Sequence, residues 1–159
     1  MAAIMVLTAG STGDFGPFAA LAERLGSRGH TVTLTADSGF ERLAPAGPVE
    51  FAPIRADFRS LLPPTPARSR PSLRGEVFPA IQGMLEDSWA VARSRQPEVI
   101  VAHQKSLAAP HLAEKLDIPY IQALTVPMVT PTRDSRCLGS FGTTSARPST
   151  ARATALSAC

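Results

Sequence analysis

One aspartate in a glycine-rich turn, Asp14, is the residue of this sequence best placed to do chemistry. It lies in the stretch Gly10-Ser-Thr-Gly-Asp-Phe-Gly16, which follows an apolar run that begins at Ala3. Glycines free the backbone of a turn and let it approach a ligand closely. A helix that begins soon afterwards, near Pro17, would point the positive end of its dipole at the same place. The turn is therefore a candidate ligand site, and the Asp14 carboxylate would face whatever binds above it.

Two polar residues allow more than one interpretation. Aspartate is a preferred N-cap, so capping of the following helix is the structural alternative for Asp14. His103 follows another apolar run, and open parallel sheets bind ligands at the carboxyl ends of their strands. A ligand contact is the functional interpretation of His103, and a structural role is the alternative. We assign no chemistry to His30 or His111.

The elements expected to hold these residues alternate between strand and helix. Apolar periodicity and glycine boundaries predict strands at 3–9, 31–36, 49–54, 98–102 and 118–124. They predict helices at 17–28, 75–96 and 106–116, and a short helical segment after Ser38. This alternation predicts an α/β fold with a Rossmann-like, doubly wound parallel sheet.

Two segments fall outside this pattern. Residues 55–74 are rich in Pro, Arg and Ser, which predicts a long mobile loop that gates ligand entry. Residues 133–159 have no periodicity and consist mainly of Ser, Thr, Ala and Arg, so we expect a disordered tail. The predicted organisation is one domain at 1–132 followed by this tail.

Composition and charge exclude several classes of protein. Residues 1–132 hold 12 basic and 12 acidic side chains, so the net charge of +3 comes from the tail, and nucleic-acid binding is not expected. No apolar run has the length of a membrane helix, and no signal peptide is evident, which favours a cytoplasmic protein. Cys137 and Cys159 form no metal-ligand pattern, so no metal is expected.

Three stretches together resemble the N-terminal domain of glycosyltransferase family 28, the sterol 3-beta-glucosyltransferase-like and antibiotic-aglycone glycosyltransferases of GT-B fold. The stretches run from Thr8 to Phe18, from Leu25 to Phe40, and from Ala109 to Thr132. The first departs from the family's usual pattern, because Thr12 stands for the commoner Arg and Gly16 for the commoner Gln.

The resemblance implies that Asp14 acts as general base on an acceptor hydroxyl that attacks the anomeric carbon of a nucleotide-sugar. A positioned carboxylate makes an alcohol a better nucleophile by taking its proton in the transition state. The acceptor would be a hydrophobic alcohol: a lipid, sterol or polyketide. No cofactor is implied, since the nucleotide-sugar is a substrate. The acceptor site would be formed by Gly10, Ser11, Thr12, Gly13, Phe15, His103, Thr130 and Thr132.

The resemblance also implies a second domain that binds the donor, and no such pattern follows residue 132. The tail is similar to the product of a frameshift or a truncation, and we expect the chain to be inactive alone. A separately encoded donor-binding chain is then a candidate partner, and peripheral contact with a membrane stays open.

Two other classes of function remain open. The spacing Gly10-x-x-Gly13-x-x-Gly16, with Asp37 after the second strand, also fits an NAD(P)-binding, short-chain dehydrogenase-like protein. Against it, Leu124 stands where the lysine of a Tyr-x-x-x-Lys pair would follow Tyr120. The third class is a non-catalytic accessory fragment that associates through an exposed apolar face.

Overall fold

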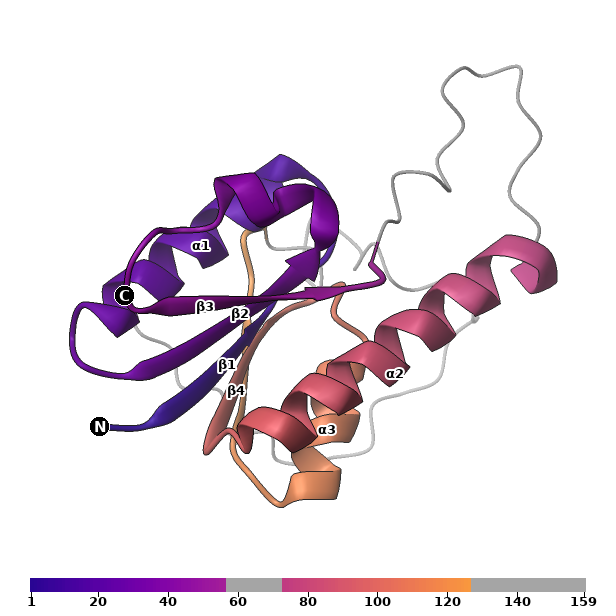
Figure 1. Cartoon of the computed structure of the whole chain (residues 1–159). Coiled ribbons are helices and arrows are strands. Elements are labelled where there is room, and N and C mark those ends of the chain that lie inside the picture. Colours follow the sequence, from indigo (N-terminus) through magenta and orange to yellow (C-terminus); the bar gives the residue numbers. More distant parts are fainter. Residues whose placement is uncertain (57–72, 127–159) are drawn as a thin grey trace, which may run out of the picture. The chain divides into compact units, whose positions relative to one another are not determined.

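A computed structural model describes residues 1–56 and 73–126, and within them a parallel sheet is covered by helices on both faces (Figure 1). The strands are β1 (Ala3–Leu7), β2 (Thr31–Asp37), β3 (Val49–Ile54), β4 (Val99–His103) and β5 (Tyr120–Ala123). The helices are α1 (Thr12–Gly26), α2 (Phe78–Arg95) and α3 (Ala108–Leu116), with a 3-10 segment η1 (Ser38–Leu43) and a π-helical segment η2 (Leu73–Val77). The predicted α/β class is confirmed.

The order of the strands places a topological switch point beside β1. The sheet runs β3-β2-β1-β4-β5, and every pair is parallel. After β1 the chain builds β2 and β3 on one side, then crosses to build β4 and β5 on the other. Ligands of open α/β sheets bind at such a switch point, outside the carboxyl ends of the strands. Here the switch point lies between β1 and β4.

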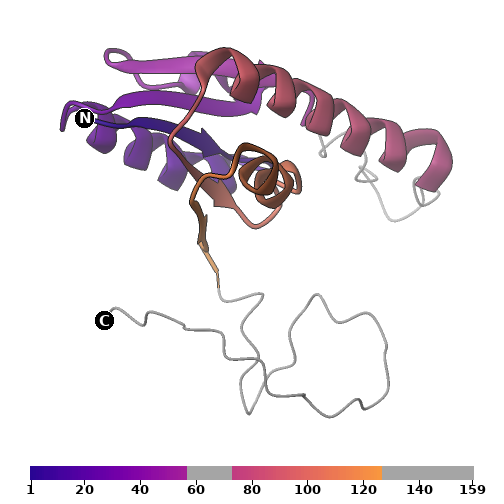
Figure 2. The ribbon, with the colours of Figure 1, turned by 90° about the horizontal axis from the view of Figure 1, so that it is seen from below.

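Alternate residues of β1 pack against different helices. Ile4 and Val6 belong to the core cluster that faces α1, whereas Met5 and Leu7 belong to the cluster that includes residues of α2 and α3. Both faces of β1 are therefore buried, as expected for a central parallel strand. Figure 2 shows the sheet between α1 and the pair α2 and α3 from a second direction.

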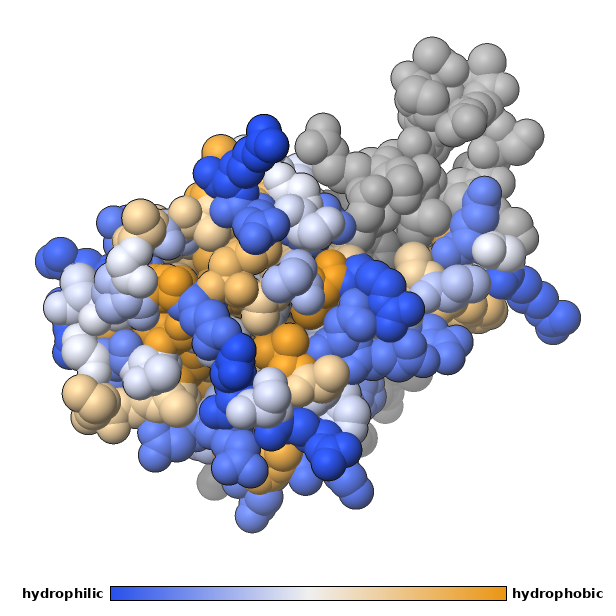
Figure 3. All heavy atoms as spheres, in the orientation of Figure 1, coloured by the Kyte–Doolittle hydropathy of each residue, from blue (hydrophilic) through white to orange (hydrophobic). Residues whose placement is uncertain are grey.

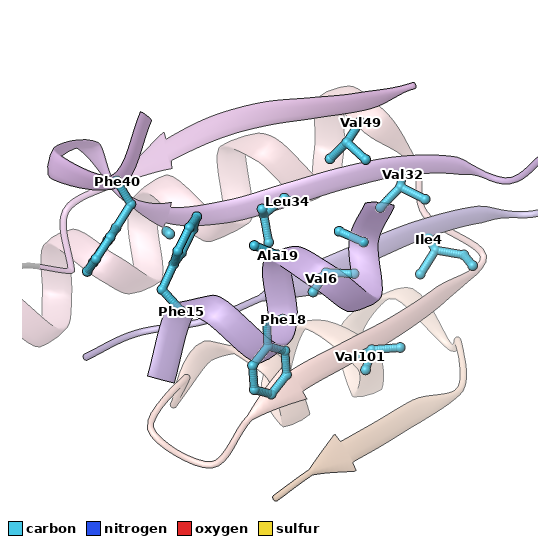
Figure 4. Close-up of a cluster of buried hydrophobic side chains, with 12 residues drawn as sticks. Ile4, Val6, Phe15, Phe18, Ala19, Val32, Leu34, Phe40, Val49 and Val101 are labelled. Atoms are coloured by element: carbon cyan, nitrogen blue, oxygen red, sulfur yellow. The ribbon is translucent and has the colours of Figure 1, made fainter. Parts of the chain in front are cut away.

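A pair of aromatic rings joins α1 to η1 in the first of these clusters. The rings of Phe15 and Phe40 stack with centroids 4.6 Å apart and planes 9° from parallel (Figure 4). Both side chains are buried. The stack fixes the first turn of α1 against the segment that follows β2, so it supports the end of the sheet where Asp14 lies.

The expected start of the first helix was wrong. We expected it near Pro17, but α1 begins at Thr12 with Ser11 as the N-cap residue, and Pro17 lies inside the helix. Proline inside a helix loses the hydrogen bond of its missing N–H, and its ring crowds the carbonyl four residues earlier, which is why a helix start near Pro17 was expected. The other predicted strands and helices are present, with ends that differ by up to three residues.

Several predictions lie outside the described residues. These are the disordered tail, the domain boundary at 132 and most of the expected loop, whose last two residues, Leu73 and Arg74, belong to η2. On the face drawn in Figure 3, hydrophilic residues cover most of the described surface, with small groups of hydrophobic residues between them. No helix in the two described ranges is long and apolar enough to cross a membrane.

Candidate functional site

The carboxylate of Asp14 is held by the turn that precedes α1. Asp14 occupies the third position of the helix, one turn after the N-cap Ser11. Its Oδ2 accepts hydrogen bonds from the backbone N–H of Ser11 at 2.7 Å and from the Ser11 hydroxyl at 2.9 Å. The bond from the N–H is the reciprocal half of a capping box. The interpretation of Asp14 as the N-cap residue was therefore wrong. Ser11 is the N-cap residue, and Asp14 is the third residue of the helix, whose side chain bonds back to Ser11.

Two residues from the end of β4 approach the same carboxylate. Lys105 Nζ lies 2.8 Å from Oδ2, and His103 Nε2 lies 3.3 Å from Oδ1. Because β1 and β4 are neighbours, residues about 90 positions apart meet at the switch point. The His103 ring is 0% exposed and packs edge-on against Phe18, with centroids 5.4 Å apart. The Asp14 side chain keeps 14% of its surface exposed.

Gly10 makes room for this arrangement. Its φ of +129° is one that residues with a side chain rarely adopt. A Cβ at this position would overlap Asp14 Oδ2 and lie 3.2 Å from Lys105 Nζ. The glycine is thus required both by the backbone conformation and by the carboxylate that occupies the space beside it.

The surroundings keep Asp14 ionised and His103 neutral. Burial by itself raises the pKa of Asp14, but the hydrogen bonds from Lys105 and Ser11 outweigh it and hold the pKa below its usual value. Burial lowers the pKa of His103; the charge of Lys105 acts in the same direction, and Asp14 and a backbone hydrogen bond with Ala9 oppose it. At neutral pH the site therefore contains a carboxylate, an ammonium group and an uncharged imidazole.

The predicted site residues divide into three groups. Gly10, Ser11, Thr12 and Gly13 lie with Asp14 in the turn and first turn of α1, and His103 lies behind the carboxylate. Phe15 is not brought to the crevice, since its ring stacks in the core. Thr130 and Thr132 lie outside the described residues. The acceptor contacts of all these residues stay predictions.

Lys105 is the site residue that sequence reasoning missed. It follows β4 by two residues, and the turn at 103–107 is closed by a backbone hydrogen bond from Ser106 to His103. Its position two residues beyond His103, at the carboxyl end of a predicted strand, was the available signal.

The geometry of the turn does not favour a bound dinucleotide. A dinucleotide turn offers backbone N–H groups to a pyrophosphate, but the Ser11 N–H is already bonded to Asp14. Asp37, the candidate for ribose binding, accepts a hydrogen bond from the Gly39 N–H and caps η1. Burial raises the pKa of Tyr120, which is the wrong direction for a proton-transferring tyrosine.

Other potential sites in the described ranges offer less chemistry. These residues contain no group of three His, Cys, Asp or Glu side chains that could hold a metal ion. An open pocket of about 320 Å³ lies beyond the ends of β2 and β3 and is lined by Asp37, Ser38, Pro53, Ile54, Arg55, Ala80 and Asp87. The Arg55 guanidinium in this pocket is already bonded to Asp87 and Glu86.

Comparison with solved structures defines the class of fold. A glycosyltransferase of Streptomyces sp. SF2575, solved with thymidine diphosphate, has a similar fold, with a TM-score of 0.61 and 23% identity. The match covers 78% of this chain and 38% of the Streptomyces chain. The glycosyltransferase of kitacinnamycin has a TM-score of 0.62 and 26% identity, and the match covers 80% of this chain and 31% of the kitacinnamycin enzyme. The described fold is that of the N-terminal half of a GT-B glycosyltransferase.

Sequence comparison then gives the family. Residues 4–132 match the glycosyltransferase family 28 N-terminal domain, so the chain belongs to this family. A sterol 3-beta-glucosyltransferase of Arabidopsis thaliana is 30% identical in an alignment of 144 residues, and the alignment covers 82% of this chain and 23% of the relative. One of Komagataella phaffii is 32% identical over 129 residues, 77% of this chain and 10% of the relative. The chain thus spans less than a quarter of these relatives.

Proposed function

We propose that this chain is the acceptor-binding half of a hexosyltransferase that moves a sugar from a nucleotide-sugar to the hydroxyl of a lipid, sterol or polyketide. The observation that carries the proposal is the Asp14 carboxylate, which is ionised, partly exposed and fixed at the switch point of the sheet. The names of the sterol 3-beta-glucosyltransferases among its relatives support an apolar alcohol as the acceptor.

Asp14 would act as a general base. The acceptor oxygen forms a bond to the anomeric carbon while its proton passes to Asp14, and the bond from that carbon to the nucleoside diphosphate breaks with the electron pair on the leaving group. An alcohol becomes acidic only as the new bond forms, so a carboxylate of low pKa can still take the proton in the transition state. Neutral His103 would keep Oδ1 oriented towards the acceptor.

The 159-residue chain should bind the acceptor without transferring sugar. Its match is to the N-terminal domain of the family, and it covers 31% and 38% of the two solved glycosyltransferases described above. Donor binding would then depend on a further domain or on a partner chain. Binding of a fluorescent sterol with no transfer from UDP-glucose is the expected result, whereas transfer by the purified chain would overturn this part of the proposal.

The role of Asp14 is tested by Asp14→Asn in a fusion of this chain to the donor-binding part of a sterol 3-beta-glucosyltransferase. Asparagine keeps an oxygen that can accept the Ser11 bond but cannot take a proton, so transfer should fall by about 10²- to 10⁴-fold while sterol binding is kept. Asp117→Asn is the matched control, since Asp117 is exposed at the end of α3 and Asn tolerates its left-handed backbone. Equal transfer by the Asp14 and Asp117 variants would refute the base assignment.

A further inference from the structure

The two oxygens of the Asp14 carboxylate differ in their bonding. Oδ2 accepts three hydrogen bonds, from the Ser11 N–H, the Ser11 hydroxyl and Lys105 Nζ, at 2.7 to 2.9 Å. Among residues 1–56 and 73–126, the polar neighbour of Oδ1 is His103 Nε2, at the longer distance of 3.3 Å. A carboxylate oxygen has two lone pairs, so Oδ2 is saturated and Oδ1 can still accept a hydrogen bond.

From this asymmetry we propose that Lys105 is a positioning residue for the Asp14 base: with Ser11 it fixes Oδ2 and leaves Oδ1 to receive the proton of the acceptor. This inference rests on the proposed function for the identity of the acceptor. An ion pair with a 45% exposed lysine contributes little to the stability of the fold. Its effect would instead be on the orientation and charge of the carboxylate.

The backbone segments that follow β1 and β4 meet at this ion pair. Lys105 reaches Asp14 from a turn that also brings in His103, and the Lys105 N–H points at His103 Nδ1 at 3.4 Å. On the opposite side, a side chain at Gly10 would collide with Oδ2 and approach Nζ. The absence of a side chain at Gly10 therefore leaves the space in which Asp14 and Lys105 meet.

Proton transfer would also change the state of Lys105. When the acceptor proton binds Oδ1, Asp14 becomes neutral, and its attraction for the ammonium group is largely lost.

The experiment is a carboxyl ¹³C NMR titration of the full 159-residue chain and three variants. In the part of the chain that the structure describes, the charged or titratable groups against Asp14 are Lys105 and His103, so both resonances are followed together with the Ser11 amide proton. Lys105→Met should raise the pKa of Asp14 and allow a second side-chain rotamer, visible in its three-bond couplings. Lys105→Arg should keep the pKa low and the rotamer single.

Lys115→Met is the matched control, because it removes the same charge from an exposed position on α3. It should leave Asp14 unchanged. If Lys105→Met gives the same Asp14 titration and couplings as Lys115→Met, Lys105 is only an exposed ion-pair partner and the inference fails.

If a variant does not fold, the inference can still be tested by a measurement on the unsubstituted chain. The Lys105 Nζ shift and the Ser11 amide proton shift should both follow the titration of Asp14, because both groups bond to the carboxylate that loses its charge. An Nζ shift that does not follow this titration would overturn the inference. None of these readouts needs sugar transfer, so a failed transfer assay with a positive titration would count against the proposed function alone.

Discussion

Gly10 is the single residue on which the geometry of the candidate site depends most. Its backbone has a positive φ, and the space that a side chain would need is filled by Oδ2 of Asp14. Gly10→Ala should therefore displace the carboxylate and lower the free energy of unfolding by about 1–3 kcal/mol. Urea denaturation measures the loss of stability, and the NMR pKa of Asp14 reports the displacement.

A second glycine of the same stretch provides the control for that prediction. Gly13 lies in the first turn of α1, and a Cβ there would lie 3.7 Å from the Ser11 hydroxyl, which is an ordinary contact. Gly13→Ala should stabilise the chain by about 0.5–1 kcal/mol, because alanine loses less backbone entropy in a helix. If both substitutions change the free energy of unfolding in the same direction, the explanation given for Gly10 is wrong.

At the scale of elements, the contact between α1 and η1 depends on one aromatic stack. Phe40 is 7% exposed and lies flat against Phe15, so Phe40→Ala should cost about 3–5 kcal/mol of unfolding free energy. Phe78→Ala removes the same atoms from a side chain that is 58% exposed and should change stability by less than about 0.5 kcal/mol. Similar losses for the two variants would show that the stack does not hold these elements together.

Most elements could be predicted because their signals are local. The apolar runs of the strands and the helical stripe of α2 are visible in windows of ten to twenty residues. The start of α1 was misplaced because Pro17 is a common marker of a helix start, although Ser11 and Asp14 already had the spacing of a capping box. The partnership of Lys105 with Asp14 could not be predicted in this way, since it requires β1 and β4 to be neighbours.

Across the described part of the molecule, an ion pair with several hydrogen bonds joins the end of β3 to α2. Asp87 accepts bonds from the N–H of Arg55 at 2.8 Å and from its guanidinium at 2.8 and 2.9 Å. The hydrogen bonds from the Arg55 side chain lower the pKa of Asp87 below its model-compound value of 3.8, and burial opposes them only in part. A lowered pKa in the folded state means that Asp87 stabilises the fold above that value and loses this contribution as the pH falls through the folded pKa.

Acid unfolding tests this connection. Asp87→Asn should be less stable than the unsubstituted chain at pH 7, and the difference should shrink as the pH falls below about 3.8. Glu114→Gln, which removes an exposed carboxylate from α3, should show no such trend. A difference between Asp87→Asn and the unsubstituted chain that is constant from pH 7 to pH 2 would exclude the ion pair as its cause.

The order of the strands also sets the time at which the site can form during folding. β1, β2 and β3 are consecutive in the chain and can pair early, whereas β4 must return across the sheet after more than 40 residues to reach β1. Contacts between distant segments form late, because the entropy of closing a long loop must be lost first. Asp14 should therefore meet Lys105 and His103 only in the last steps of refolding, when most of its own half of the sheet is already in place.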